Sequence, residues 1–186
     1  AVVAFVIPSR IDPMTGKTGI AQTRPGKAGQ LEVRIQLEHG AGAILKVSES
    51  MIWGTPWGYF EPSGPSIPLD GVWKTRFMEA GPEIPDPYET PTLGSWTTLG
   101  GSKAERFSGT ARYSLAFNRP STGAKRWKLD LGNVAETARV WLNGKEMAVL
   151  TGPRYTVIFE EQQLMDTNVL EVYVSNLMAN RIADMD

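Results

Sequence analysis

The chain has 186 residues, no cysteine, a single histidine and a formal net charge of −1 from 19 basic and 20 acidic side chains. Its length allows one large domain or two small ones, and the missing cysteines exclude disulfides, thiolate nucleophiles and zinc–thiolate sites. The balanced charge argues against nucleic acid as a partner, and no apolar run approaches the roughly 20 residues of a membrane span.

Residues 1–49 read as the C-terminal strands of a preceding β-domain. Apolar and polar residues alternate through 30–38, which predicts a strand with one buried and one wet face. The apolar positions are Leu31, Val33, Ile35 and Leu37. A glycine-bearing connection of hairpin length leads to a second strand over 43–49, and 1–7 reads as a third. We expect the polar stretch Pro8–Gly29 to be a long loop between them.

Two local motifs of this part read as turns rather than sites. Gly16-Lys17-Thr18 resembles the end of a phosphate-binding loop, but Ile11 stands where that motif needs a glycine. His39 begins a glycine-rich stretch, yet the chain has no Gly-x-Ser-x-Gly nucleophile elbow, so we expect an exposed turn residue and no hydrolytic triad.

Residues 50–68 are rich in proline and glycine, which break β-ladders, and therefore predict a linker. The linker also carries Trp53, Trp57 and Tyr59, more aromatic area than a free tether needs. We expect it to lie against a surface. Trp57 is also a candidate for stacking on a sugar ring.

After Asp70 short alternating segments return, spaced by turns and without helical periodicity, which predicts an all-β fold, an antiparallel β-sandwich. The expected strands are VWKTRF, TARYSLAF, RWKLDL, ARVWL, KEMAVL, YTVIF and VLEVYV. Asn143-Gly144 predicts a type I′ hairpin, and one helical turn is expected after Glu161. Nothing else reads as helical. Asp130, Asp166, Asp184 and Asp186 offer oxygen ligands for a structural calcium ion, but no EF-hand spacing is present.

Several blocks of the second half occur in one order. They include LDGVW from Leu69, FSGTARY from Phe107, LDLGNV from Leu129, ARVWLNGK from Ala138, and NVLEVYVSNL from Asn168 followed by Asn180-Arg181. This series over 69–186 resembles the galactose-binding-like jelly-roll domain of glycoside hydrolase family 2, and most closely its relative in family 106 α-L-rhamnosidases.

The resemblance implies roles for several residues. In family 2 enzymes the loop that resembles Trp-Leu-Asn-Gly reaches toward the catalytic pocket, which makes Asn143, with Trp141 beside it, a substrate-facing candidate. Asn176, Asn180 and Arg181 either satisfy loop groups or contact ligand. Trp73 and Tyr113 are expected in the core.

The resemblance also implies that the family's catalytic carboxylates lie on a (β/α)₈ barrel of around 250 residues, which this chain does not contain. We therefore expect a fragment of a larger, secreted or periplasmic glycoside hydrolase, rhamnosidase-like, truncated at both ends. Its partners would be carbohydrate and the missing barrel, with no cofactor and no catalytic residue of its own. An autonomous carbohydrate-binding module and a purely structural inter-domain sandwich remain the alternatives.

Overall fold

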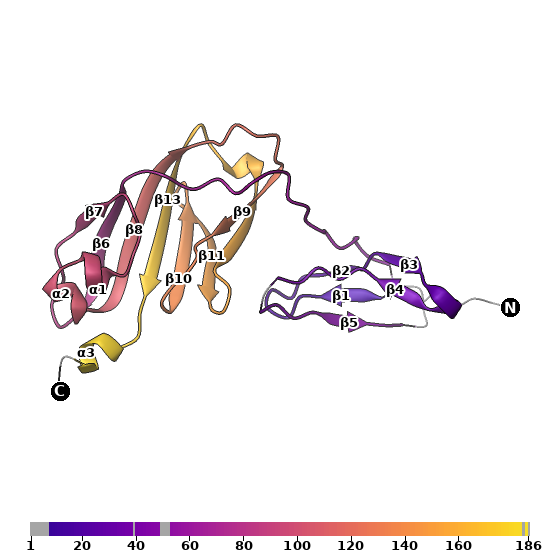
Figure 1. The fold of residues 1–186 in the computed structure, drawn as a ribbon, viewed down its shortest axis with the longest axis horizontal. Helices are drawn as coiled ribbons and strands as arrows, with labels where there is room; N and C mark the ends of the chain where they lie inside the picture. Colours follow the sequence, from indigo (N-terminus) through magenta and orange to yellow (C-terminus); the bar gives the residue numbers. More distant parts are fainter. Residues whose placement is uncertain (1–7, 39, 49–52, 184, 186) are drawn as a thin grey trace. The chain divides into compact units, whose positions relative to one another are not determined.

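The computed structural model describes residues 8–38, 40–48, 53–183 and 185. The chain divides into two compact units, Ala1–Gly64 and Pro65–Asp186 (Figure 1). The strand pairs in both units are antiparallel, apart from one isolated parallel bridge. The all-β prediction is therefore confirmed. No helix among the described residues is long and apolar enough to cross a bilayer.

The first unit contains two small sheets. Strand β1 (Ser9–Ile11) lies between β2 (Thr18–Ile20) and β5 (Ile44–Lys46). A separate hairpin pairs β3 (Thr23–Pro25) with β4 (Leu31–Val33) across the single 3₁₀ turn Lys27–Gly29. Each strand has three residues, so none of these ladders is long enough to form a core by itself.

The predicted arrangement of the first unit is partly wrong. The stretch Pro8–Gly29, expected as one loop, contains β1, β2 and β3. The strand expected over 30–38 ends at Val33, and Ile35 and Leu37 are about half exposed. The physical reason is that alternation buries an apolar face only where a second layer covers it. Residues 1–7 and His39 lie outside the described residues.

Residues 57–60 are partly buried in the first unit, as the aromatic content of the linker predicts, whereas Trp53 and residues 61–68 are exposed. A parallel bridge joins Ile20 to Pro56, and the Trp57 amide donates to the Ile20 carbonyl at 2.7 Å. The Tyr59 hydroxyl accepts from the Gln22 amide and donates to the Arg34 carbonyl at 2.8 Å. These bonds attach the proline-rich segment to the small sheets.

The second unit is built on a six-stranded sheet in the order β11-β10-β13-β8-β6-β7. The strands are β6 (Trp73–Gly81), β7 (Tyr88–Thr90), β8 (Ser108–Asn118), β10 (Thr137–Leu142), β11 (Lys145–Thr151) and β13 (Thr167–Ser175). Figure 1 shows β13 running between β8 and β10. A second sheet pairs β9 (Arg126–Asp130) with β12 (Thr156–Glu160).

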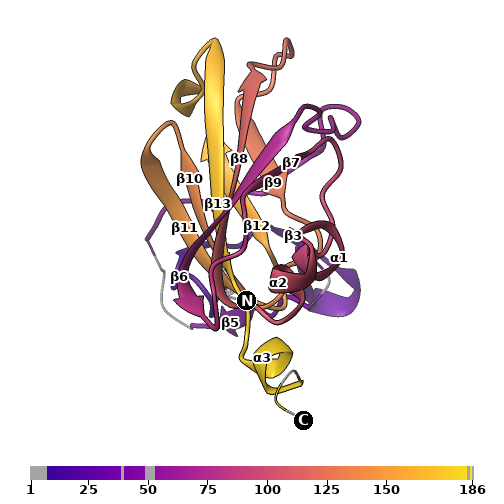
Figure 2. The same ribbon diagram turned by 90° about the vertical axis from the view of Figure 1, so that its left-hand side faces the viewer.

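One core lies between these two sheets, with the larger sheet seen in a second view in Figure 2. Ala111, Tyr113 and Leu115 point inward from β8, and Val157 contributes from the smaller sheet. Trp73 is also buried, as expected. The seven predicted strands of this unit are confirmed, because alternation and turn residues agree along each of them.

Short helices close one part of this core. Helix α1 (Trp96–Leu99) and helix α2 (Ser102–Glu105) carry Trp96 and Ala104 into the core. Trp96 and Phe107 meet edge to face at 6.0 Å between ring centroids, and both contact Phe77. The prediction of a helical turn after Glu161 is confirmed as Glu161–Gln163. The expectation of no other helix is wrong, because the structure also contains α1, α2 and α3 (Ala179–Ala183). These helices have four or five residues, too few for a helical period to appear in the sequence.

Candidate functional site

Asn143 occupies the predicted hairpin turn between β10 and β11. Its φ is 52° and that of Gly144 is 77°, as a type I′ turn requires, so this prediction is confirmed. The Asn143 amide nitrogen donates to Asn168 Oδ1 at 2.9 Å and to the Gln163 carbonyl at 3.3 Å. Its Oδ1 accepts from the Val169 amide at 2.9 Å.

These bonds limit what Asn143 can offer a ligand. Both amide protons are used within the fold, so only the second lone pair of Oδ1 is left for a sugar hydroxyl. Asn168 is fully buried and also bridges both backbone groups of Met165. The pair therefore ties the loop before β13 to the turn. This network was not predicted from the sequence. The one signal for it in the sequence is Asn168, a polar residue at the start of the otherwise apolar strand β13.

Trp141 lies on the opposite face of the sheet from the core. Val140 and Leu142 on either side of it are buried in the core, whereas Trp141 is half-buried on the outer face. Its neighbours across the strands are Glu171 on β13 and Glu146 on β11. Its indole Nε1 is shielded and has no hydrogen-bond acceptor among the described residues. Trp141 therefore lies on the outer face of the sheet, whereas the Asn143 amide is bonded to groups within the fold.

Asn180 and Arg181 lie in α3, beyond the C-terminal end of β13. Arg181 is exposed, and its Nη1 would lie 3.3 Å from a Cβ built on Gly81. Asn143 lies near the N-terminal end of the same strand, whose nine residues span roughly 30 Å. The two groups are therefore too far apart to contact one sugar ring.

Asn176 satisfies loop groups, as predicted for the asparagines of this ending. Its Oδ1 accepts from the Gly109 amide at 2.8 Å, and its Nδ2 donates to the Phe107 carbonyl at 3.0 Å. The side chain thus clamps the start of β8 to the end of β13, a structural role.

Trp57 belongs to the first unit and is covered by cations. The Arg10 guanidinium carbon lies 4.2 Å from the centre of its ring, and Lys17 Nζ lies 5.5 Å away. Arg10 is itself buried and donates to the Gln36 carbonyl at 2.7 Å. A sugar that stacked on the Arg10 side of the ring would have to displace the Arg10 guanidinium from it. That face of Trp57 therefore has a structural contact within the first unit. Trp53 is 85% exposed.

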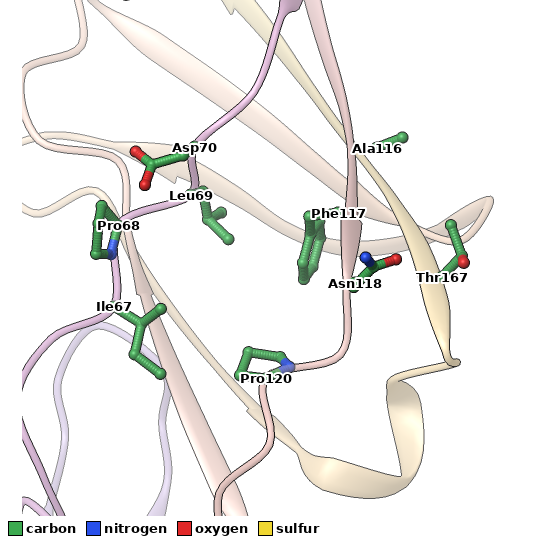
Figure 3. Close-up of a pocket in the computed structure, with 9 residues that line it drawn as sticks. All are labelled: Ile67, Pro68, Leu69, Asp70, Ala116, Phe117, Asn118, Pro120 and Thr167. Atoms are coloured by element: carbon green, nitrogen blue, oxygen red, sulfur yellow. The ribbon is translucent and has the colours of Figure 1, made fainter.

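A hollow of about 360 Å³ lies where the chain enters the second unit (Figure 3). Figure 3 shows Leu69, Ile67, Phe117 and Pro120 around its centre, while the Asp70 carboxylate points away from it. The remaining lining residues are Pro68, Ala116, Asn118 and Thr167. Apolar side chains therefore lie around its centre, and Asn118 and Thr167 add polar groups to its lining.

The described residues contain no group of three or more His, Asp or Glu side chains placed to hold a metal ion. Of the calcium candidates, Asp130 accepts the Gly132 amide at 2.9 Å in a turn, and Asp184 and Asp186 lie outside the described residues. Burial raises the pKa of the Tyr113 hydroxyl above its ordinary range. The Arg106 guanidinium, followed by Lys103, lowers the pKa of the Glu83 carboxyl at the surface.

No family model matches the chain. It is 33% identical over 119 residues to a protein of Formosa agariphila named "Putative beta-glucuronidase". This alignment covers 62% of the present chain and 10% of that protein. Among solved structures, a rhamnosidase from Novosphingobium sp. PP1Y aligns over 95% of this chain and 17% of its own, with 26% identity and a TM-score of 0.74.

These similarities confirm that the chain resembles parts of glycoside hydrolases, in its fold and in its sequence. The rhamnosidase alignment covers nearly the whole chain, so both units have counterparts in that enzyme. The chain spans only a tenth of the curated relative and about a sixth of the rhamnosidase.

Proposed function

We propose that this chain is a non-catalytic, carbohydrate-binding accessory module of a larger glycoside hydrolase, rhamnosidase-like, that acts on plant or microbial polysaccharide. The carrying observation is the alignment of 95% of the chain with 17% of a rhamnosidase at a TM-score of 0.74. What favours a binding or positioning role over cleavage is that the chain matches only about a sixth of that enzyme. The proposal includes a secreted or periplasmic location, where polysaccharide is encountered.

Affinity electrophoresis tests the binding half of this proposal. The chain is run in native gels that contain a rhamnose-bearing pectic polysaccharide, with a neutral glucan gel and a non-binding protein as controls. We expect selective retardation in the pectic gel. Unchanged mobility in every polysaccharide gel would contradict carbohydrate binding.

Activity assays test the non-catalytic half. The purified chain is incubated with an aryl α-L-rhamnoside and, separately, with an aryl β-D-glucuronide. We expect no release of the aryl group above the buffer rate. Turnover of either substrate that scales with protein concentration and survives repurification would overturn this part.

A structural, inter-domain sandwich is the second candidate. It is favoured by exposed apolar side chains near the C-terminus, where Leu177, Met178 and Ile182 are each more than half exposed. Such side chains are typical of surfaces that pack against another domain. This candidate predicts no retardation in any polysaccharide gel, so the same experiment separates the two.

A further inference from the structure

The turn between β10 and β11 contains an asparagine that is chemically labile. Of the asparagines in the sequence, Asn143 alone is followed by glycine. Because Gly144 has no side chain, its backbone nitrogen can approach the side-chain carbonyl carbon Cγ of Asn143 closely. When this nitrogen loses its proton and bonds to Cγ, a succinimide ring closes, the bond from Cγ to Nδ2 breaks, and Nδ2 leaves as ammonia. Water then opens the ring to aspartate or isoaspartate.

In the folded chain the side-chain amide of Asn143 is held by hydrogen bonds on both sides. Nδ2 donates to Asn168 Oδ1 at 2.9 Å and to the Gln163 carbonyl at 3.3 Å, and Oδ1 accepts from the Val169 amide at 2.9 Å. Two of these partners are backbone groups, so the network itself determines which end of the side-chain amide is the nitrogen. Nδ2 must break both of its bonds before it can leave as ammonia. The network therefore opposes the reaction in the closed turn.

The turn is nevertheless open to water. Gly144 is exposed, and a Cβ built on it would meet nothing within 4 Å. Water and hydroxide can therefore reach the backbone nitrogen that has to lose its proton. Loops and turns open locally at a lower free energy than the core of a fold. Each opening of this turn frees the Asn143 amide to react while the core stays folded.

The product of the reaction does not fit the network. A carboxylate at position 143 has no hydrogen to donate, so one of its oxygens would face two acceptors, Asn168 Oδ1 and the Gln163 carbonyl. Acceptors that face a negative oxygen without a donor between them cost free energy in a partly buried site. Asn168 is fully buried and also bonds both backbone groups of Met165. Loss of the amide at Asn143 therefore disturbs the residue that ties the loop before β13 to the turn.

We propose that Asn143 is a modification site, which deamidates when the β10–β11 turn opens and thereby loosens the loop before β13. The reaction is irreversible, so it sets a limit on the lifetime of the fully bonded structure. The inference goes beyond carbohydrate binding and does not depend on it.

Mass spectrometry of the full chain tests where and when the reaction occurs. The chain is kept in mildly alkaline buffer, folded or unfolded in guanidinium chloride, and the peptide that contains Asn143 is monitored for replacement of the amide by a carboxyl. We expect conversion in both samples, slower by about tenfold or more in the folded chain, because the bonded amide reacts only after the turn opens.

Asn133 is the control site in the same digest. It is exposed, and Val134 after it carries a β-branched side chain that crowds the attacking nitrogen, so it should react more slowly than Asn143 in the unfolded chain. Equal rates at Asn143 in the folded and unfolded chain would overturn the inference, as would no conversion in the folded chain. Faster conversion in the folded chain would also overturn it and would show that the Val169 amide stabilises the reacting oxygen.

Two substitutions test the consequence for the fold. Asn143→Asp reproduces the aspartate product, and Asn133→Asp adds the same charge at an exposed position as the matched control. Asn143→Asp should lower the urea midpoint and speed hydrogen exchange at the Met165 amide, which donates to Asn168 Oδ1, whereas Asn133→Asp should change neither. Failure of Asn143→Asp alone to fold would support the same conclusion. Equal urea midpoints and equal exchange in the two variants would show that the product stays in the network and would overturn the inference.

Discussion

Asn143 shows what a single residue's sequence context can and cannot reveal. The dipeptide Asn143-Gly144 predicts its own turn because positive φ at both positions is a local requirement. The partners of the Asn143 amide lie 20 to 26 residues away, at Gln163, Asn168 and Val169. No local sequence pattern encodes contacts at such separations along the chain. The role of Asn143 in holding the loop before β13 is therefore visible only in the folded structure.

Trp57 gives the same lesson for the candidate site. Its aromatic ring and its surroundings of proline and glycine fit a sugar platform in the sequence. The cations that cover it come from Arg10 and Lys17, which lie 47 and 40 residues earlier in a stretch that was expected to be a loop. The wrong assignment of the Pro8–Gly29 stretch therefore concealed the partners of Trp57.

Tyr113 leads to a prediction about pH. Burial, aided by neighbouring Tyr88, raises the pKa of the Tyr113 hydroxyl above the value of about 10 expected in the unfolded chain. Below pH 10 the hydroxyl is neutral in both states and its stabilisation is fully present. Above pH 10 only the unfolded state ionises, so the free energy of unfolding should fall by about 1.4 kcal/mol per pH unit from this group until its folded pKa is reached.

Urea unfolding at pH 9 and pH 11 measures this loss. The Tyr113→Phe variant lacks the ionisable group, so its free energy of unfolding should fall by about 1.4 kcal/mol less between the two pH values. Equal falls in the variant and the unaltered chain would show that Tyr113 ionises equally easily in the folded state.

At the scale of elements, the seven longer strands of the second unit were predictable, whereas the three-residue β7 (Tyr88–Thr90) and the other short elements were not. Strands β8, β10 and β13 have six to eleven residues, long enough for alternation to appear several times. Strands β1 and β2 have three residues each, and helices α1 and α2 have four. Elements of that length contain at most about one and a half repeats of a strand or helix period, which is too few to identify a pattern, and tertiary contacts decide their conformation.

The junction of α1 and α2 depends on Gly100. A Cβ at this position would lie 2.6 Å from the Ala104 Cβ and 2.8 Å from the Trp96 carbonyl, both in the closely packed cap of the core. Gly100→Ala should therefore lower the free energy of unfolding by about 2 kcal/mol, in the range found for overpacked cores. Gly123→Ala is the control, because a Cβ there meets nothing within 4 Å. Urea denaturation of both variants checks the difference, and equal stabilities would show that the junction relaxes freely.

At the scale of the whole molecule, the two units differ in how they are stabilised. The buried hydrophobic cluster, which includes Trp73, Phe107 and Val172, lies entirely in the second unit. The buried side chains described in the first unit are few, and one of them is the charged Arg10. Burial of apolar area is the dominant favourable term in folding, so the second unit should carry most of the stability.

Residues 65–186 should therefore fold and bind without the first unit. Expressed alone, this fragment should unfold in one cooperative thermal transition followed by tryptophan fluorescence, because every residue of the core cluster is retained. It should also keep the retardation of the full chain in gels that contain the rhamnose-bearing pectic polysaccharide, since the β-sandwich proposed to bind carbohydrate lies within it. Residues 1–64 alone should show neither a cooperative transition nor retardation. A fragment 65–186 that melts cooperatively but migrates freely, while the full chain is retarded, would move carbohydrate binding to the first unit and return Trp53 and Trp57 to consideration as the sugar-stacking residues.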